Sequence, residues 1–547
     1  MRRTLVIMVL FVAVLTVPFV LRPHQQGFVG DHDDLVIITP HNGALRYEFD
    51  RGFSKWYQQK TGRTVAIDWR AIGGTSEITR YLEGEYTTSF QHLWTQSLHR
   101  AWSGEIQAGF QNASLPAQAS ADVRAAREEF LKSDASCGID LFFGGGTYDF
   151  IHQAQIGTLV DSGILQKHPE WFHDEVIPHD FAGEDYWDRH GLWIGTVLSS
   201  YGLLSNRDVL AQRGVSLPQQ WTDLENGKLM GTVALADPTK SSSMAKVFEN
   251  IIQQQMQRRL LELAKRQPTL SKMEREAQAV AAGWLDGLRV IQLIGANAGY
   301  FTDNSQKPPI DVAAGDFGIG LCIDFYGRQQ QEAVERRGHS DRLSYISPAG
   351  GSIASVDPIG LLRGAPHREI ASLFIEYVLT MEGQKLWNFR VGTPGGPERY
   401  PLRRLPVRRD FYGHTEFKPY LTDPEDAPYA ENPDRLIYHP AWTAKYFREM
   451  SFVIRVMCLD THDELVRARR AILEAGGPPE ALARLQDLSA VDYEQTTHWI
   501  HQQLTSKDKT DEIKIGQTLG QHFRQQYGEA ERLARESLGK KTTASSP

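Results

Sequence analysis

The chain has 547 residues, which is too long for one hydrophobic core and predicts roughly two to four domains. Its net charge of -8, with no long basic run and no zinc-finger or helicase signature, gives no reason to expect nucleic acid as a partner. The three cysteines, Cys137, Cys322 and Cys458, form no CxxC pair, so a structural zinc site is not expected.

The N-terminus predicts export. Arg2 and Arg3 precede the uncharged apolar run Leu5–Leu21, which is the order of a secretory signal. No clear small-x-small cleavage site follows, so residues 1–30 are interpreted as a signal or as a single retained membrane anchor. In either case the leading positive charge keeps that end in the cytoplasm. The rest of the chain is therefore expected in the periplasm or another extracytoplasmic space, with or without an anchor in the inner membrane.

The next part of the chain alternates strands and helices. Leu35–Ile38 is predicted as a strand, and the helix after it ends at Lys60-Thr61-Gly62, where glycine commonly terminates helices. Thr64–Trp69 is predicted as a second strand, which runs into Gly73-Gly74-Thr75-Ser76 and a helix over 77–83. This order predicts a parallel α/β arrangement.

Residues 84–130 break this alternation and are interpreted as an inserted flap followed by a helix. The run Ile139–Phe143 then predicts a buried strand that stops at Gly144-Gly145-Gly146. Glycines at that point let backbone N–H groups approach a ligand closely. In open α/β sheets, ligands bind beyond the carboxyl ends of the strands.

The middle of the chain predicts a second α/β unit between two crossing segments. The apolar stretch 193–204 is interpreted as a crossing between domains, and 352–362 as the return. Between them, Val233–Ala236 is predicted as a strand, and Thr239–Ser243 as the start of a helix that runs through Gln255. Serine and threonine at a helix start either satisfy the free N–H groups or leave them open to an anion.

Three stretches share this design: 71–77, 141–150 and 236–243. We expect them to face one cleft, although Gly and Ser are also common in ordinary surface turns. Further on, an amphipathic helix is predicted from Ile370 to Met381. Residues 410–547 are largely helical in pattern.

An arginine cluster follows the amphipathic helix. It is interpreted as a solvated face, or as salt bridges to neighbouring carboxylates, rather than as a ligand site. Its members are Arg399, Arg403, Arg404, Arg408 and Arg409.

The order of these segments resembles that of the extracellular solute-binding proteins of ABC importers, of the family 1 or ferric-iron-binding type. The resemblance covers roughly residues 34–410. Besides the N-terminus, the matching segments are Leu35–Pro40, Gly74–Ser76, Asp140–Thr147, Ala234–Thr239, Val312–Gly320 and Gly364–Trp387.

The resemblance implies an α/β, two-lobed periplasmic-binding-protein fold of type II, whose lobes close on a ligand like a hinged clamp. Lobe one would comprise 34–195 and 352–410, and lobe two 196–351, with a helical C-terminal extension over 411–547. The implied partner is an ABC permease in the inner membrane, which receives the solute.

The resemblance also implies where the ligand is bound. In lobe one the implied contacts are Thr39, His41, Thr75, Ser76, Gly145, Gly146 and Thr147. In lobe two they are Thr239, Ser241, Ser242, Ser305, Asp324 and Tyr326. These donor-rich loops at strand ends and helix starts suit an anion or a polar solute.

Ferric iron is the other ligand implied by the resemblance, whereas no resident cofactor is expected. Members that hold iron commonly use phenolates, often from an adjacent tyrosine pair, and this sequence contains no Tyr-Tyr pair. The single residues that could bind a metal are Tyr148, Tyr201, Tyr300, Tyr326, His41 and Glu77. The Gly, Thr and Ser character of the loops favours an anion or a small organic acid.

An enzyme is not expected, because the sequence has no GxSxG elbow, no HExxH motif and no GxxxxGK[ST] loop. An exported hydrolase would have to recruit Asp149 and Asp324 as an acid–base pair. A membrane-tethered sensor component that binds its ligand in the same cleft is a further alternative.

Overall fold

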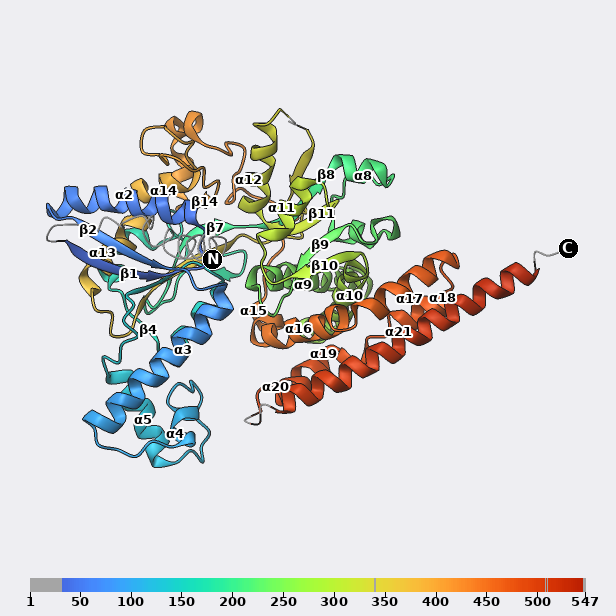
Figure 1. The fold of residues 1–547 in the computed structure, drawn as a ribbon, viewed down its shortest axis with the longest axis horizontal. Coiled ribbons are helices and arrows are strands. Elements are labelled where there is room, and N and C mark those ends of the chain that lie inside the picture. The colour runs from blue at the N-terminus through green and yellow to red at the C-terminus, as the bar shows by residue number, and fades with distance from the viewer. Residues whose placement is uncertain (1–31, 339–340, 507, 509, 545–547) are drawn as a thin grey trace, which may run out of the picture.

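The computed structural model describes residues 32–338, 341–506, 508 and 510–544, so the predicted signal or anchor lies outside the described residues. Two mixed β-sheets lie side by side (Figure 1). The strands of the first sheet, in spatial order, are β14 (Leu405–Pro406), β7 (Ile194–Ser199), β13 (Ser355–Leu362), β3 (Leu141–Phe143), β1 (Asp33–Ile38) and β2 (Val65–Arg70), with β4 (Leu159–Val160) beside β13. Those of the second are β10 (Ala298–Thr302), β9 (Val233–Ala236), β11 (Ile319–Ile323), β8 (Tyr201–Asn206) and β12 (Leu343–Ile346).

We call the first sheet with its helices the first lobe, and the second sheet with its helices the second lobe. The helices up to residue 212 are α2 (Gly43–Thr61), α3 (Thr75–His92), α4 (Gly104–Gly109), α5 (Ala121–Lys132), α6 (Thr147–Ile156), α7 (Ile164–Lys167) and α8 (Arg207–Gln212). Those up to residue 388 are α9 (Ser242–Arg266), α10 (Lys272–Ala296), α11 (Lys307–Ala314), α12 (Asp324–Glu335), α13 (Arg368–Leu379) and α14 (Met381–Asn388). The C-terminal extension contains α15 (Pro440–Thr443), α16 (Phe447–Ile454), α17 (His462–Glu474), α18 (Pro479–Leu485), α19 (Tyr493–Gln495), α20 (His501–Leu504) and α21 (Thr510–Ala544).

The α/β opening of the first lobe is confirmed. β1 pairs in parallel with both β2 and β3, so their carboxyl ends meet at one edge of the sheet. α2 buries Leu45, Phe49 and Phe53 against this sheet, and it ends at Gly62, whose φ of 75° suits glycine.

The predicted helix over 77–83 is too short. α3 begins at Thr75 and continues to His92, so the first part of the expected flap is helix. Its far end buries Phe90, which stacks on Phe110 with ring centroids 4.9 Å apart and meets Phe130 edge-on. These buried rings hold α4 and α5 against the end of α3, and together they form an arm at the lower left of Figure 1.

The described chain passes between the two lobes three times. β7 ends at Ser199 in the first sheet and β8 begins at Tyr201 in the second. The return runs from β12 to β13. The third connection, residues 421–439, starts beside Phe389 of the first lobe and leads to α15, which packs on α9.

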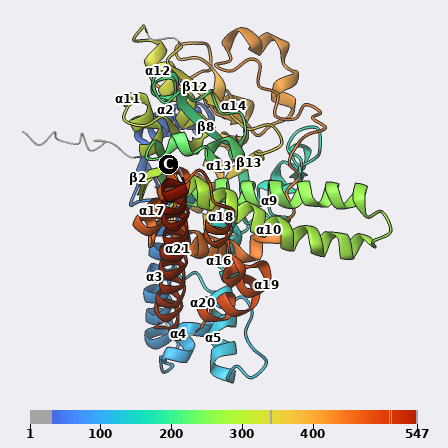
Figure 2. The ribbon, with the colours of Figure 1, turned by 90° about the vertical axis from the view of Figure 1, so that its right-hand side faces the viewer.

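The second lobe and the C-terminal extension share one hydrophobic core. Its central contact is between α9 and α10, where Gly283 and Gly287 face the backbone of Met256 and Ile252 so closely that a Cβ would lie 2.4–2.6 Å from a backbone atom. The two helices project as a hairpin in Figure 2. Among the described residues, α10 is the one helix long and apolar enough to cross a membrane, but 72% of its most apolar window is buried, as in a core helix.

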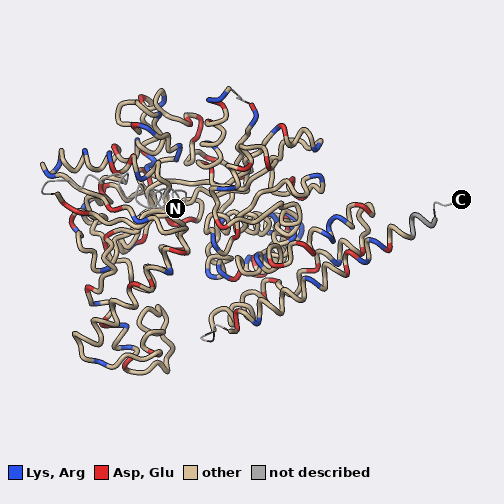
Figure 3. Tube along the Cα trace, viewed as in Figure 1, with Lys and Arg blue, Asp and Glu red and all other residues tan. Residues whose placement is uncertain are grey.

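Acidic and basic residues are interspersed along the traces of both lobes and of α21 within the described residues (Figure 3).

Candidate functional site

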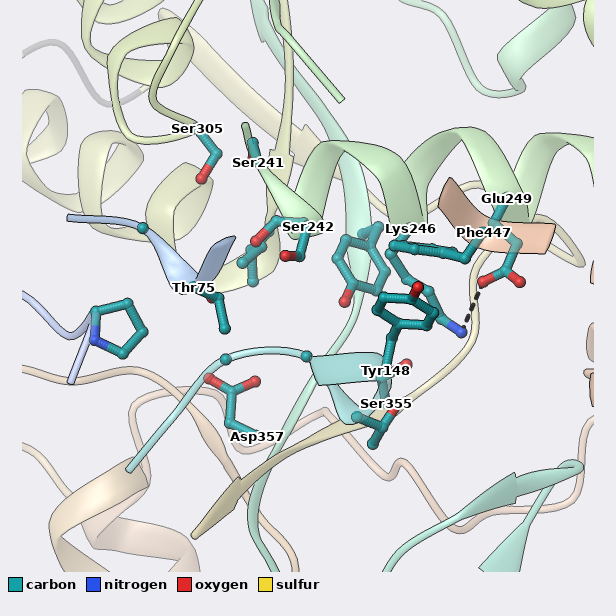
Figure 4. Close-up of a pocket in the computed structure, with 18 of the residues that line it drawn as sticks. Thr75, Tyr148, Ser241, Ser242, Lys246, Glu249, Ser305, Ser355, Asp357 and Phe447 are labelled. Carbon is teal, nitrogen blue, oxygen red and sulfur yellow. Dashed lines mark ion pairs between the residues drawn. The ribbon is translucent and has the colours of Figure 1, made fainter. Parts of the chain in front are cut away.

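The three loops singled out in the sequence meet at one cavity of about 830 Å³ between the lobes (Figure 4). The first lobe contributes the ends of β1, β2 and β3, and the second contributes the start of α9 and the loop after β10. Nine of the predicted contact positions line the cavity: His41, Thr75, Gly145, Gly146, Thr147, Ser241, Ser242, Ser305 and Tyr326.

Several helices begin at this cavity. α3 starts after Gly74 and α6 after Gly146, and neither has a side chain capping its first turn. α9 starts after Ser241, whose side chain accepts a hydrogen bond from the N–H of Met244. Helix N-termini carry partial positive charge and free N–H donors. The arrangement therefore suits the negatively charged group of a ligand.

Glycine is required where the β3 loop passes the other two segments of the first lobe. Gly144 and Gly145 have φ values of 88° and 122°. A Cβ on Gly144 would lie 2.2 Å from the His41 ring, and one on Gly145 would lie 2.6 Å from the Thr75 methyl group. The glycines thus allow the loop backbone to lie directly against the predicted contact residues.

Four predicted contact residues do not line the cavity. Thr39 is fully buried, and its hydroxyl donates to the Phe143 carbonyl over 2.6 Å. The Thr239 hydroxyl donates to Asp237 over 2.7 Å, within its own turn. Asp324 is buried beneath the loops and accepts from the N–H of Phe325. These side chains shape the loops, so the expectation that they face the cavity is wrong.

Ser76 is the fourth of these residues. It lies in the first turn of α3, next to Thr75, but it is absent from the lining of the cavity. On a helix, neighbouring positions point in directions about 100° apart, so only one of the two faces the ligand space.

The lobes touch directly at the edge of the cavity. The Ser242 hydroxyl, in the first turn of α9, donates to Asp149 Oδ2 of α6 over 3.1 Å. A Cβ on Gly74 would lie 3.4 Å from the Lys240 carbonyl. The two lobes are therefore in direct contact beside the cavity. Burial raises the pKa of Asp149 to about 6, against the opposing effect of Ser242.

Asp149→Asn is expected to remove a pH dependence of stability. Because the folded pKa exceeds the ordinary 3.8, the folded state favours the protonated form. The free energy of unfolding that protonated Asp149 contributes is fully present below about pH 4 and is lost as the pH rises through 6. The change is about 3 kcal/mol for about two pKa units. Urea unfolding should show that the stability of the variant relative to the wild type is higher at pH 7.5 than at pH 4 by that amount. Asp208→Asn, at an exposed carboxylate, is the control; an equal difference at both pH values would contradict the assignment.

A buried charge cluster that the sequence did not predict lies at the other end of the cavity. Lys246 Nζ lies 2.5 Å from Glu184 Oε1. It lies 2.8 Å from Glu249 Oε2, the ion pair marked in Figure 4. Burial lowers the pKa of Lys246, but the two carboxylates hold it well above its usual range. Lys246 and Glu249 follow Ser242 by four and seven residues, so helical spacing from the predicted helix start was the available signal.

A second buried cluster forms the floor of the cavity. Arg404 is fully buried, lies 2.8 Å from Asp357 Oδ2 and also bonds the Ser199 hydroxyl. Burial raises the pKa of Asp357, but Arg404 and His41 hold it below its ordinary value. Of the predicted alternatives for the arginine cluster, the salt bridge is therefore correct for Arg404 and the solvated face is wrong.

The same cluster fixes the state of His41. Burial lowers its pKa, so the ring is neutral at pH 7. Its Nε2 lies 3.5 Å from Asp357, and Nδ1 is buried without a hydrogen-bond partner among the described residues.

The predicted metal candidates do not form a cluster. Tyr148, Tyr201 and Tyr326 line the cavity, whereas Tyr300 donates to Asp311 over 2.6 Å elsewhere. Burial raises the pKa of Tyr148 and of Tyr326 to about 12, which disfavours free phenolates. Among the described residues, no group of three or more His, Cys, Asp or Glu side chains could hold a metal ion.

Fold and cavity together define a two-lobed protein with a cavity between its lobes. Residues 138–400 match the sequence model of the family described as bacterial extracellular solute-binding protein. The matched residues, just under half of the chain, confirm the resemblance seen in the sequence. The α/β, two-lobed fold expected from it, with a helical C-terminal region, is confirmed as well.

Two curated relatives match part of the chain. An uncharacterized protein of Haemophilus influenzae is 22% identical over 251 residues, which are 45% of this chain and 60% of that protein. The phosphoglycerate transport regulatory protein PgtC of Salmonella typhimurium is 21% identical over 193 residues, 35% of this chain and 40% of that protein. The chain thus spans less than two thirds of either relative.

Solved structures show similar lobes at low similarity scores. The periplasmic binding protein AfuA from Actinobacillus pleuropneumoniae, with exogenous fructose-6-phosphate bound, is 14% identical, with a TM-score of 0.45 over 81% of this chain and 99% of that chain. The apo ferric ion-binding protein A of Pasteurella haemolytica is 11% identical, with a TM-score of 0.46 over 78% and 98%. Neither likeness bears on the ligand of this protein.

Proposed function

We propose that this protein captures a small organic anion between its lobes and delivers it to an ABC permease in the inner membrane. The observation that carries the proposal is the convergence of α3, α6 and α9 on one cavity, with the first turns of α3 and α6 uncapped by side chains. Helix N-termini stabilise a bound anion without a dedicated basic residue. The protein performs no chemistry on the solute.

The anion is favoured over ferric iron by the donors at this end of the cavity. Thr75 and Thr147 present hydroxyl groups beside the N-termini of α3 and α6. These groups donate hydrogen bonds to an anion, whereas iron requires oxygen ligands that carry negative charge. The exported position, with or without retention of residues 1–30 as an anchor, places the cavity where an external solute reaches it.

The test is Thr75→Ala combined with Thr147→Ala, at the two cavity-lining hydroxyls at the starts of α3 and α6. Each hydroxyl hydrogen bond to a charged group contributes about 1.5–3 kcal/mol, so the double variant should lose at least a hundredfold in affinity. A thermal-shift screen of the wild type against phosphate, phosphonates, sulfonates, dicarboxylates and ferric iron identifies the anion. At a hundredfold excess over Kd the ligand adds about 2.7 kcal/mol of stability.

Thr239→Ala is the matched control, because this hydroxyl bonds within its own turn and does not line the cavity. Its affinity for the same anion should be close to that of the wild type. A shift by iron alone, with the visible colour of a phenolate complex, would refute the anion proposal. Unchanged affinity in the double variant would refute the site.

A further inference from the structure

The C-terminal extension belongs mechanically to the second lobe. Trp284 of α10 donates to the carbonyl of Val491 over 2.9 Å, and Gln292 donates to that of Leu485 over 2.9 Å. The buried side chains of α16, α17 and α21 lie in the same hydrophobic core as those of α9 and α10. The extension and the second lobe therefore move as one body.

The start of this extension forms part of the cavity wall. Tyr438 and Phe447 line the cavity together with the Lys246 cluster; Figure 4 labels Phe447 and Lys246. The Tyr438 hydroxyl donates to Glu249 Oε1 over 2.9 Å, and its ring lies 3.9 Å from Lys246 Nζ. Gln253 of α9 exchanges two hydrogen bonds with the backbone of His439, each of 2.9 Å. These contacts fix the wall on α9.

The same segment also touches the first lobe. The N–H of Tyr438 donates to the Ala182 carbonyl over 2.7 Å, in the turn of the short hairpin of β5 (Asp180–Phe181) and β6 (Glu184–Asp185). Gly183 in that turn allows the approach, because a Cβ there would lie 1.9 Å from the Tyr438 carbonyl oxygen. Phe447 packs on Tyr148 of α6, with ring centroids 4.8 Å apart. The extension thus bridges the lobes at the cavity.

The volume of about 830 Å³ is far more than an inorganic ion needs, since a water molecule occupies about 30 Å³ of liquid, and it lies in the range of pockets for organic ligands. We infer that the C-terminal extension is a specificity wall: with Tyr148, its residues Tyr438 and Phe447 select an anion whose body carries a ring. We call these three residues the aromatic end. This inference rests on the proposed anion-binding function.

The chemistry of the aromatic end fits such a body. Its rings offer flat apolar faces that pack against another ring. Ser355 also lines the cavity, is 4% exposed, and has no hydrogen-bond partner for its hydroxyl among the described residues. A buried polar group without a partner is costly, so a polar substituent of the ligand would satisfy it.

Binding to the full chain is tested with two pairs of anions that share a charged group and differ in the ring. The pairs are phenyl phosphate with inorganic phosphate, and benzoate with acetate. In at least one pair the ring-bearing anion should bind tenfold more tightly or better. Phe447→Ala should reduce that preference at least fivefold and leave the affinity for the small anion unchanged. Phe417→Ala, also 8% exposed but outside the cavity lining, is the matched control and should retain the preference.

Equal affinity within both pairs, or a preference that survives Phe447→Ala, would overturn the inference although anions bind. If none of the four anions binds, the inferred ligand class fails, and the separate screen against phosphonates, sulfonates and dicarboxylates decides whether the anion-binding function fails with it. A measurement without ligand tests the wall separately. Tyr148→Cys with Phe447→Cys should be joined by a short bifunctional thiol reagent, since the native cysteines are buried. Absence of this cross-link would show that the extension does not close on α6.

Discussion

Lys246→Met is expected to lower the free energy of unfolding by about 3–5 kcal/mol. Its ammonium group lies between Glu184 and Glu249, which are both almost fully buried. Removing the one cation leaves two carboxylates in a poorly solvated place, where an uncompensated charge is far less stable than in water. Methionine fills a similar volume, so the loss reports on charge rather than on packing.

Urea unfolding at pH 7 measures this loss. Lys132→Met removes a lysine whose side chain is 71% exposed and 3.9 Å from Glu128, and it should change stability by less than about 0.5 kcal/mol. A Lys246 variant as stable as the Lys132 variant would mean that the carboxylates are neutral or hydrated in the folded protein.

Arg404→Met is expected to cost a similar amount, about 3–5 kcal/mol, for the same physical reason at the cavity floor. Asp357 would lose its closest cation, and Ser199 would lose a donor. Since Arg404 and His41 hold the pKa of Asp357 below its ordinary value, this carboxylate stabilises the fold above the ordinary pKa and ceases to do so as the pH falls through the folded value. The variant should therefore lose more stability, relative to the wild type, at neutral pH than at acid pH.

Adding Asp357→Asn to Arg404→Met should recover part of the loss, because the unpaired charge is removed. Arg399→Met is the control within the same arginine cluster. Arg399 is exposed and its guanidinium lies 5.1 Å from the Tyr400 ring, so its loss should be below about 1 kcal/mol. Equal losses for Arg404 and Arg399 would contradict the structural role assigned to Arg404.

Local patterns in the sequence predicted the α/β units and the loops that meet at the cavity, whereas the two-lobed arrangement was implied by the resemblance. The apolar run into Gly144–Gly146 predicted a buried strand end, and Ser241 and Ser242 predicted a helix start at the cavity. Both signals lie within a few neighbouring residues. Thr39 and Thr239 carry the same local signal, but their hydroxyls bond the Phe143 carbonyl and Asp237 instead of facing the ligand. Which of these a hydroxyl does depends on χ1, which the sequence does not show.

The remaining part of the site depends on contacts between distant residues. Lys246 meets Glu184 across 62 positions, Arg404 meets Asp357 across 47, and Tyr438 reaches Glu249 across 189. No periodicity connects such positions, because they come together only when the lobes and the extension are packed. The interpretation as a solvated face was wrong for Arg404 for this reason, because its carboxylate partner Asp357 lies on β13.

The third connection between the lobes affects how often the cavity is open and how long a solute stays in it. Each additional covalent link restricts the relative rotation of two bodies, so residues 421–439 reduce the number of open conformations. A smaller open ensemble loses less entropy when it closes. The free protein then spends a larger fraction of time in its binding-competent form, and its observed affinity approaches the intrinsic one. The same restriction leaves the solute fewer routes of escape, which lengthens its residence.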